Sequence, residues 1–185
     1  TIRGRNEFLN RGATDGVINT DNTFTSMQIE AGISHFYLKG SAAAAIDGLN
    51  ISDVVMFFGS IASNQYNVYV EYGLWVTITN SKFFWAGVDG LRCSNCSYVA
   101  ISNNVYASPG KQQLGNGIYL TGTDTTKAYN TNIVVSGNYI HAPSKHGILV
   151  ENTYRFAALG NIIRTPSNEA TYDADQTILY DGINV

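Results

Sequence analysis

Charged residues are scarce in this chain, and their scarcity excludes several classes of protein. Only 14% of the 185 residues are charged, against about a quarter in an ordinary soluble domain. The formal net charge of −3 leaves no basic stripe for a phosphate backbone, which argues against a nucleic-acid partner. No apolar run is long enough to span a membrane, and the opening TIRGRNEFLN lacks the apolar stretch of a signal peptide. We therefore expect no membrane insertion, and no export signal is visible.

Cysteine is also rare. The two cysteines, Cys93 and Cys96, are three residues apart, and the chain has neither a second such pair nor a paired histidine motif. Two thiolates alone cannot complete the four-ligand shell of a structural zinc site. We therefore expect ordinary thiols, no metal and no cofactor.

Small polar residues and tyrosine are abundant instead. The chain has 18 Gly and 12 Tyr but only three Pro, and it is rich in Asn, Ser and Thr. Asn, Thr, Gly and Tyr are weak helix formers, and this mixture favours strands separated by short polar turns. The length suits one domain or one segment of a solenoid.

A five-residue pattern recurs along the chain. Its third and fifth positions are apolar, the alternation of a half-buried strand, and its second position is Gly in five of the six copies. We expect this Gly to occupy a tight corner with an unusual backbone conformation. The spacing between copies grows from 19 to 35 residues. The copies are 47–51 (DGLNI), 66–70 (YNVYV), 89–93 (DGLRC), 116–120 (NGIYL), 146–150 (HGILV) and 181–185 (DGINV).

A second pattern follows the first in four of these units, at 76–81, 99–104, 133–138 and 156–161. Each copy ends on Ser or Asn, and a third short apolar run starts at Phe83, Val105, Tyr139 or Ile162. Each unit thus offers three strands, and loops at 107–115, 122–131 and 164–179 absorb the growing spacing. The sequence predicts an all-β fold, a right-handed single-stranded parallel β-helix with about three short strands per coil. The residues at 81, 104, 138 and 161 are expected to form a ladder of stacked polar side chains.

We expect this β-helix to cover residues 27–185, after an irregular or coil segment at 1–26. The pattern starts and stops in mid-repeat, so we expect a fragment of a longer spike.

Strand alternation predicts which side chains face outwards. On the third strand these are apolar, and an exposed apolar row is rarely left bare. Either the inserted loops cover this row or other subunits do, and we favour a homotrimer. The outward residues predicted for the third strand are Phe84, Tyr106, Ile140 and Ile163; for the second, Thr77, Ala100, Val134 and Ala157; for the first, Asn50, Tyr69, Arg92, Tyr119, Leu149 and Asn184.

Tyr69, Arg92 and Tyr119 form a stripe of aromatic rings and one cation on the first strand. Aromatic rings stack on the apolar faces of sugars, and Arg binds carboxylates through two parallel hydrogen bonds. The stripe predicts carbohydrate binding, walled by the loops 107–115 and 122–131, although cross-strand packing alone also places tyrosines side by side.

These strands and turns resemble the pectate-lyase-like superfamily of right-handed β-helices, which includes pectate lyases, polygalacturonases and bacteriophage tailspikes. The DG[LI]x[IVC] strands, the turns ending in Asn and the widening insertions carry the resemblance. Tailspikes look most similar, because they too are poor in charge and rich in Asn, Gly and Tyr. The resemblance implies a trimer outside the cell or on a virion, which binds and cleaves a bacterial capsule or O-antigen polysaccharide.

Acids near the first strand are the catalytic candidates. Glycoside hydrolysis needs two carboxyl groups about 5–9.5 Å apart, and rungs are about 4.8 Å apart. Asp89 is the first choice, with Glu71 and Asp47 as partners. However, Asp before Gly is commonly a turn former, and strict alternation points position 89 inward. The second choice is the group of His146, Glu151 and Asp181.

Three functions remain open at this point: a depolymerase with paired carboxylates, a non-catalytic carbohydrate-binding adhesin, and a structural fibre segment. A depolymerase could also be a lyase, in which Arg92, His146 or Tyr119 removes the proton next to a uronate carboxylate.

Overall fold

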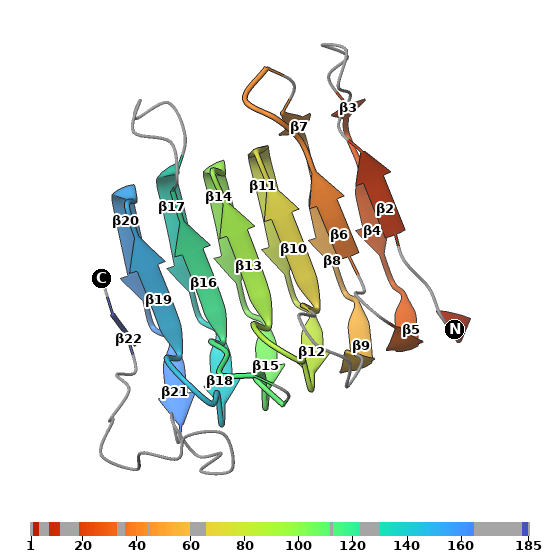
Figure 1. Ribbon diagram of the computed structural model, residues 1–185, viewed down its shortest axis with the longest axis vertical. Coiled ribbons are helices and arrows are strands. Elements are labelled where there is room, and N and C mark those ends of the chain that lie inside the picture. The colour runs from red at the N-terminus through yellow and green to blue at the C-terminus, as the bar shows by residue number, and fades with distance from the viewer. Residues whose placement is uncertain are drawn as a thin grey trace.

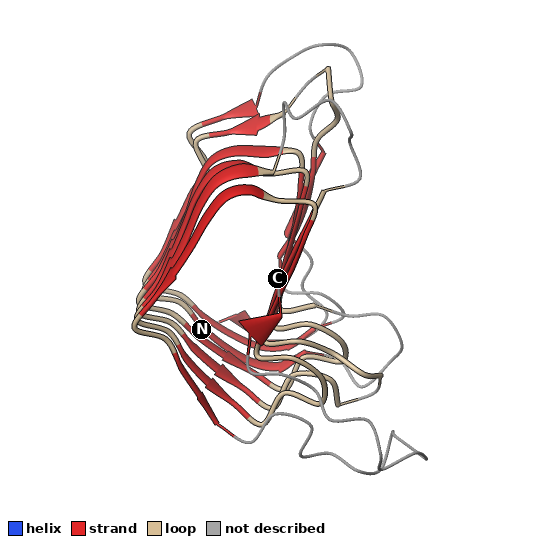
Figure 2. Cartoon of the chain, turned by 90° about the vertical axis from the view of Figure 1, so that its left-hand side faces the viewer, coloured by secondary structure: helices blue, strands red, loops and turns tan. Residues whose placement is uncertain are grey.

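Parallel strands make up all the regular structure in the described part of this computed structural model. It describes residues 2–3, 8–11, 19–32, 36–43, 45–59, 66–111, 113–122, 130–164 and 183–184. These strands form three sheets in which every pairing is parallel. Figure 1 shows successive rungs side by side, and Figure 2, which looks along the stack, shows the sheets as the sides of one coil. The predicted fold class is confirmed as a parallel β-solenoid.

The chain visits the sheets in the repeating order B, C, A. Sheet B contains β2 (Phe8–Arg11), β6 (Phe36–Lys39), β10 (Val68–Glu71), β13 (Leu91–Ser94), β16 (Ile118–Thr121), β19 (Ile148–Glu151) and β22 (Ile183–Asn184). Sheet C contains β3 (Asn19–Thr20), β7 (Ile46–Asp47), β11 (Gly73–Thr79), β14 (Ser97–Ser102), β17 (Thr131–Ser136) and β20 (Tyr154–Leu159), with β4 (Thr23–Thr25) and β8 (Asn50–Ser52) alongside. Sheet A contains β1 (Ile2–Arg3), β5 (Gln28–Gly32), β9 (Val55–Gly59), β12 (Lys82–Phe84), β15 (Val105–Ala107), β18 (Tyr139–His141) and β21 (Ile162–Arg164).

The interior is built from columns of like apolar residues. Leu91, Ile118 and Ile148 are in register on neighbouring strands of sheet B and are fully buried. This confirms the predicted interior column. Alternation along each strand puts one face of every sheet into a common core and leaves the other face outside.

The predicted polar ladder lies at the corner between sheets C and A. The backbone N–H of Ser81 donates to Asn104 Oδ1 over 2.9 Å, and the N–H of Asn104 donates to Asn138 Oδ1 over 3.0 Å. Asn138 N–H donates to Asn161 Oδ1 in the same way. Each preceding residue is left-handed, with φ of 56° at Asn103 and 64° at Gly137, which Asn and Gly tolerate best. The ladder prediction is confirmed.

Glycine is required at the corners leading into sheet B, but for a different physical reason from the one expected. Neither Gly90 nor Gly117 is among the glycines with positive φ. A Cβ at Gly90 would lie 2.7 Å from the carbonyl oxygen of Gly117, and one at Gly117 would lie 2.5 Å from that of Gly147. Close approach of backbones therefore requires glycine here, rather than an unusual conformation.

Residues 47–51 do not belong to the first sheet. Asn50 and Ile51 pair with Thr77 and Ile78 of β11 in sheet C, and β6 takes the expected place beside β10. Gly48, with φ of 72°, lies at a bend of sheet C. The sequence around it matches the pattern of the corners that lead into sheet B. The predicted outward position of Asn50 on the first sheet is therefore wrong.

The predicted apolar outer row of the third sheet is wrong at Tyr106, Ile140 and Ile163, whereas Phe84 is partly exposed. Tyr106 and Ile140 pair in register with Phe83 rather than Phe84, and all three are buried in the core. A register shift of one residue turns a strand's side chains to the opposite face. The homotrimer thus loses the row that supported it and stays a prediction. On sheet C, Val134 and Ala100 do face outwards as expected.

Strands before residue 27 extend the same sheets, since β1 pairs with β5 and β2 with β6. The predicted boundary after residue 26 falls between β4 and β5, within the stack of coils. The described residues contain no helix that is long and apolar enough to cross a membrane.

Asn104→Ala should lower the free energy of unfolding by about 2–4 kcal/mol, because it leaves the buried N–H of Ser81 and the carbonyl of Ile78 without their ladder partner. Chemical denaturation measures this change. The matched control is Asn103→Gly at the exposed left-handed neighbour, expected within about 0.5 kcal/mol of the parent. Equal losses in the two variants would contradict the ladder's role.

Candidate functional site

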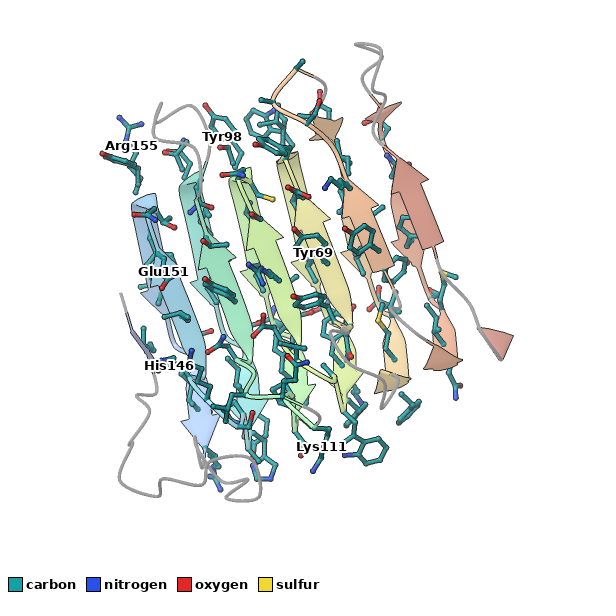
Figure 3. The ribbon with its side chains drawn as sticks, in the orientation of Figure 1. Tyr69, Tyr98, Lys111, His146, Glu151 and Arg155 are labelled. Carbon is teal, nitrogen blue, oxygen red and sulfur yellow. The ribbon has the colours of Figure 1, made fainter. Side chains whose placement is uncertain are left out.

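The outer face of sheet B carries a row of aromatic residues and one cation. We define the tyrosine stripe as Tyr37, Tyr69, Arg92 and Tyr119, which are in register on β6, β10, β13 and β16. Each is partly exposed. Figure 3 views this face and labels Tyr69 near its middle. The predicted stripe of Tyr69, Arg92 and Tyr119 is therefore assembled by the fold.

Arg92 is held between phenol rings. Its guanidinium carbon lies 4.7 Å from the ring centroid of Tyr119, 5.8 Å from that of Tyr66 and 5.9 Å from that of Tyr69. One guanidinium nitrogen donates to Tyr66 Oη over 3.1 Å, while its buried Nε has no hydrogen-bond partner within the described residues. Burial would lower the pKa of Arg92, but Tyr66 and Asp89 outweigh it and raise the pKa. The guanidinium of Arg92 is therefore held in one orientation and stays positively charged.

The ring of Tyr69 extends this packing. Its centroid lies 5.0 Å from that of Tyr37 and 5.2 Å from that of Tyr66. Burial and the nearby Glu71 raise the pKa of Tyr69 well above its usual range. The phenol is therefore neutral at physiological pH and serves as a hydrogen-bonding ring. Tyr66 and Tyr37 were absent from the predicted binding residues, because Tyr66 precedes its strand and Tyr37 lies outside the repeats read from the sequence.

Two carboxylates lie at the ends of these strands. Tyr119 Oη donates to Glu151 Oε2 over 2.5 Å, and Lys39 Nζ lies 3.0 Å from Glu71 Oε2. Burial and the bond to Glu151 raise the pKa of Tyr119, so this phenol is a proton donor at neutral pH. Glu71 and Glu151 align through Ser94 and Thr121 three rungs apart, hence about 14 Å apart. That exceeds the separation of a glycosidase pair.

Asp89 lies inside the corner that leads into sheet B. It is only 2% exposed, and its Oδ1 accepts from the backbone N–H of Asn116 over 2.7 Å and from Asn116 Nδ2 over 2.8 Å. The N–H of His146 donates in turn to Asn116 Oδ1 over 3.2 Å. Burial raises the pKa of Asp89 to about 6, although the bonds from Asn116 oppose this. The inward orientation given by strict alternation is the one observed.

The predicted carboxylate pairs are not brought together. Asp47 pairs with Leu74 in sheet C, away from the column of Asp89. Glu71 is in register with Ser94. Ser94 follows Asp89 by five residues, so Glu71 and Asp89 are about 16 Å apart along the strand direction. Their catalytic roles stay predictions, and this geometry does not support joint action.

In the second-choice group, His146 is buried in the corner, Glu151 is exposed beside the stripe, and Asp181 lies outside the described residues. Glu151 is thus the predicted acid that comes nearest to the stripe, through its bond from Tyr119.

The loop at 107–115 lies at one edge of this face. The N–H groups of Gly110 and Lys111 donate to the carbonyl of Ala86, and Ser144 N–H donates to that of Pro109. The described residues of this loop, 107–111 and 113–115, are therefore held between the turns of adjacent rungs. The second predicted wall, 122–131, is described only at 122, 130 and 131.

Among the described residues, no group of three or more His, Cys, Asp or Glu could hold a metal ion. Cys93 and Cys96 are buried free thiols, and Cys96 Sγ accepts from Gly73 N–H over 3.3 Å. They serve as core residues.

Asp89→Asn should make the protein more stable at pH 8 and little different at pH 4. A pKa of about 6 in the folded state, against about 3.9 when unfolded, means that the folded state binds the proton more tightly. Stability therefore falls as pH rises between about 4 and 6, by about 3 kcal/mol in all. An amide keeps the acceptor for Asn116 and carries no charge. Unfolding curves at both pH values test this, and a variant less stable at pH 8 would contradict it.

Comparison with known proteins agrees with this fold. The A-module of the Azotobacter vinelandii mannuronan C-5 epimerase AlgE6 superposes with a TM-score of 0.54 at 16% identity, over 90% of this chain and 51% of that one. The AlgE4 A-module matches at 0.49 and 15%, over 91% and 56%. This chain thus spans about half the length of either module. No curated protein matches the sequence. The family model described as a right handed beta helix region matches residues 31–177, so the chain belongs to the right-handed β-helix family.

Proposed function

We propose that the outer face of sheet B binds an acidic polysaccharide, and that Arg92 is its contact for a sugar carboxylate. The observation that carries this proposal is the fixed, partly exposed guanidinium among three phenol rings. A planar guanidinium meets a carboxylate through two parallel hydrogen bonds, and the rings offer flat apolar faces to sugar C–H groups.

The stripe runs across rungs, so its contacts repeat about every 4.8 Å. A repeating surface suits a repeating polymer better than a single small molecule. The structural relatives are mannuronan epimerases by name, and mannuronan is a polyuronate. At 16% identity that likeness supports the fold alone, and the ligand class is drawn from Arg92. A uronate-containing bacterial capsule or O-antigen, bound outside the cell or by a virion, fits this proposal.

A second candidate function is proton transfer next to the uronate carboxylate. Arg92 would neutralise that carboxylate and so acidify the neighbouring C–H. Glu151 would take this proton, and Tyr119, neutral because its pKa is raised, would give one up. If the proton goes to the leaving glycosidic oxygen, the C–O bond breaks and a C=C bond forms, which is elimination. Epimerisation would need a second proton donor on the opposite face of the sugar, because Tyr119 and Glu151 are hydrogen-bonded to each other and act from one side.

Arg92→Gln should weaken binding of polymannuronate about tenfold or more, because a hydrogen-bonded charge contact is lost. Isothermal titration measures the affinity, with thermal unfolding as a check on folding. Lys39→Gln, which removes a cation paired with Glu71 at the edge of the face, is the matched control and should change affinity far less. The same polymer with its carboxyls reduced should bind both variants alike. An unchanged affinity of Arg92→Gln would overturn the proposal.

Tyr119→Phe and Glu151→Gln should each lower turnover about 10²–10⁴-fold if the face is catalytic, with a smaller change in polymer affinity. Ultraviolet absorbance detects elimination, proton NMR detects epimerisation, and reducing ends detect hydrolysis. If Asp89→Asn or Glu71→Gln loses activity while Tyr119→Phe keeps it, the catalytic residues are the acids first predicted from the sequence. Binding without any of the three products would identify a non-catalytic adhesin.

A further inference from the structure

A second aromatic feature lies on sheet C, away from the tyrosine stripe. Near the start of each sheet C strand, one residue per rung has a left-handed backbone, and these residues form a column: Gly48, Trp75, Tyr98, Asn132 and Arg155. We call the last four residues of this column the ledge. The rings of Trp75 and Tyr98 stack with their centroids 4.3 Å apart and their planes at 12°. Tyr98 and Arg155 are labelled in Figure 3 along the upper edge.

The two rings of the ledge are in contact with solvent. Trp75 is 60% exposed and Tyr98 is 45% exposed. Since Tyr98 covers one face of the Trp75 ring, the exposed area of Trp75 comes from its other face and its edges. The column position on that other side is Gly48, which has no side chain. Within the described part of the chain, the column therefore leaves one face of the indole uncovered for a ligand.

The backbone at the ledge does not favour aromatic residues. Trp75 has φ of 54° and Tyr98 has φ of 56°, a left-handed conformation that Gly and Asn adopt readily and bulky residues avoid. Gly48 and Asn132 show the types that suit this position. Tyr72 and Trp85 have the same left-handed conformation elsewhere in the coil, so the backbone alone does not mark the ledge. What distinguishes the ledge is the stack of two exposed rings.

The polarity of the ledge indicates its ligand. The column continues with an amide at Asn132 and an exposed cation at Arg155. Flat rings followed by a hydrogen-bonding group and a positive charge, repeated at about 4.8 Å, fit a sugar chain that carries carboxylates.

We propose that the ledge is a second polysaccharide site, in which a pyranose ring stacks on the open face of Trp75 and a carboxylate of the same chain meets Arg155. It lies on different strands from the tyrosine stripe, and its residues are not those of the function proposed for sheet B.

The chain's two tryptophans, Trp75 and Trp85, allow a direct measurement. In a Trp85→Phe background, Trp75 is the single indole, and titration with polymannuronate or polygalacturonate should change its fluorescence in a saturable way. The signal should persist when Arg92→Gln is added, because that change removes the sheet B contact alone. Loss of the signal in Arg92→Gln would show that the fluorescence reports the stripe, and would overturn the ledge as a site.

Substitutions give the second readout. Trp75→Asn should lower the affinity for the polymer about tenfold, because the ring contact at the ledge is lost. It should not lower Tm, because Asn suits the left-handed backbone. Arg155→Gln should lower affinity and weaken its salt dependence. Tyr154→Asn, at an exposed ring outside the ledge, is the matched control and should change neither. No fluorescence response to either polymer, or a monomer–dimer equilibrium abolished by Trp75→Asn, would overturn the proposal.

Discussion

Backbone hydrogen bonding between rungs in strict register is the constraint on which every other feature depends. Each strand of one coil pairs in parallel with the equivalent strand of the next, so each side chain lies directly over its counterpart about 4.8 Å away. Like therefore stacks on like. The apolar columns of the core, the amide ladder and the tyrosine stripe are three results of one geometry.

The corners hold that register. The Oδ1 of a buried Asn at 104 or 138 accepts from a backbone N–H of the preceding rung, and its Nδ2 donates to a carbonyl three residues earlier on that same rung. A slipped rung would break several buried hydrogen bonds at once. Asp89 stands in a comparable row at the corner into sheet B. A carboxylate in such a row carries a desolvation penalty that an amide would avoid, which makes Asp89 an exception among the corner residues.

The outer faces are free of these constraints, and they differ from one another. Sheet B presents a guanidinium immobilised by Tyr66, Tyr69 and Tyr119, while the bend of sheet C presents an open indole on Trp75. Both place a flat ring and a cation on a track parallel to the stack. A rigid scaffold with repeated spacing suits an extended ligand, because the binding groups are positioned before the ligand arrives.

The sequence by itself determined the content of each rung, that is, its strands and which side chains point into the core. Alternation such as Leu91–Cys93 and the recurring Asn at 104, 138 and 161 identify three strands, one interior and one ladder, because these signals are local and repeat. The tyrosine stripe followed from the same alternation.

The tertiary structure alone decided what depends on register between rungs. A shift of one residue moved Tyr106 and Ile140 from the surface to the core, and Gly48 imitated a corner while lying on another sheet. The stack of Trp75 on Tyr98 could be suspected from aromatic residues preceding two equivalent strands, but a left-handed residue breaks the alternation by which faces are assigned. Pairing across 23 or more residues is set by how the coils close, and no local pattern contains that information.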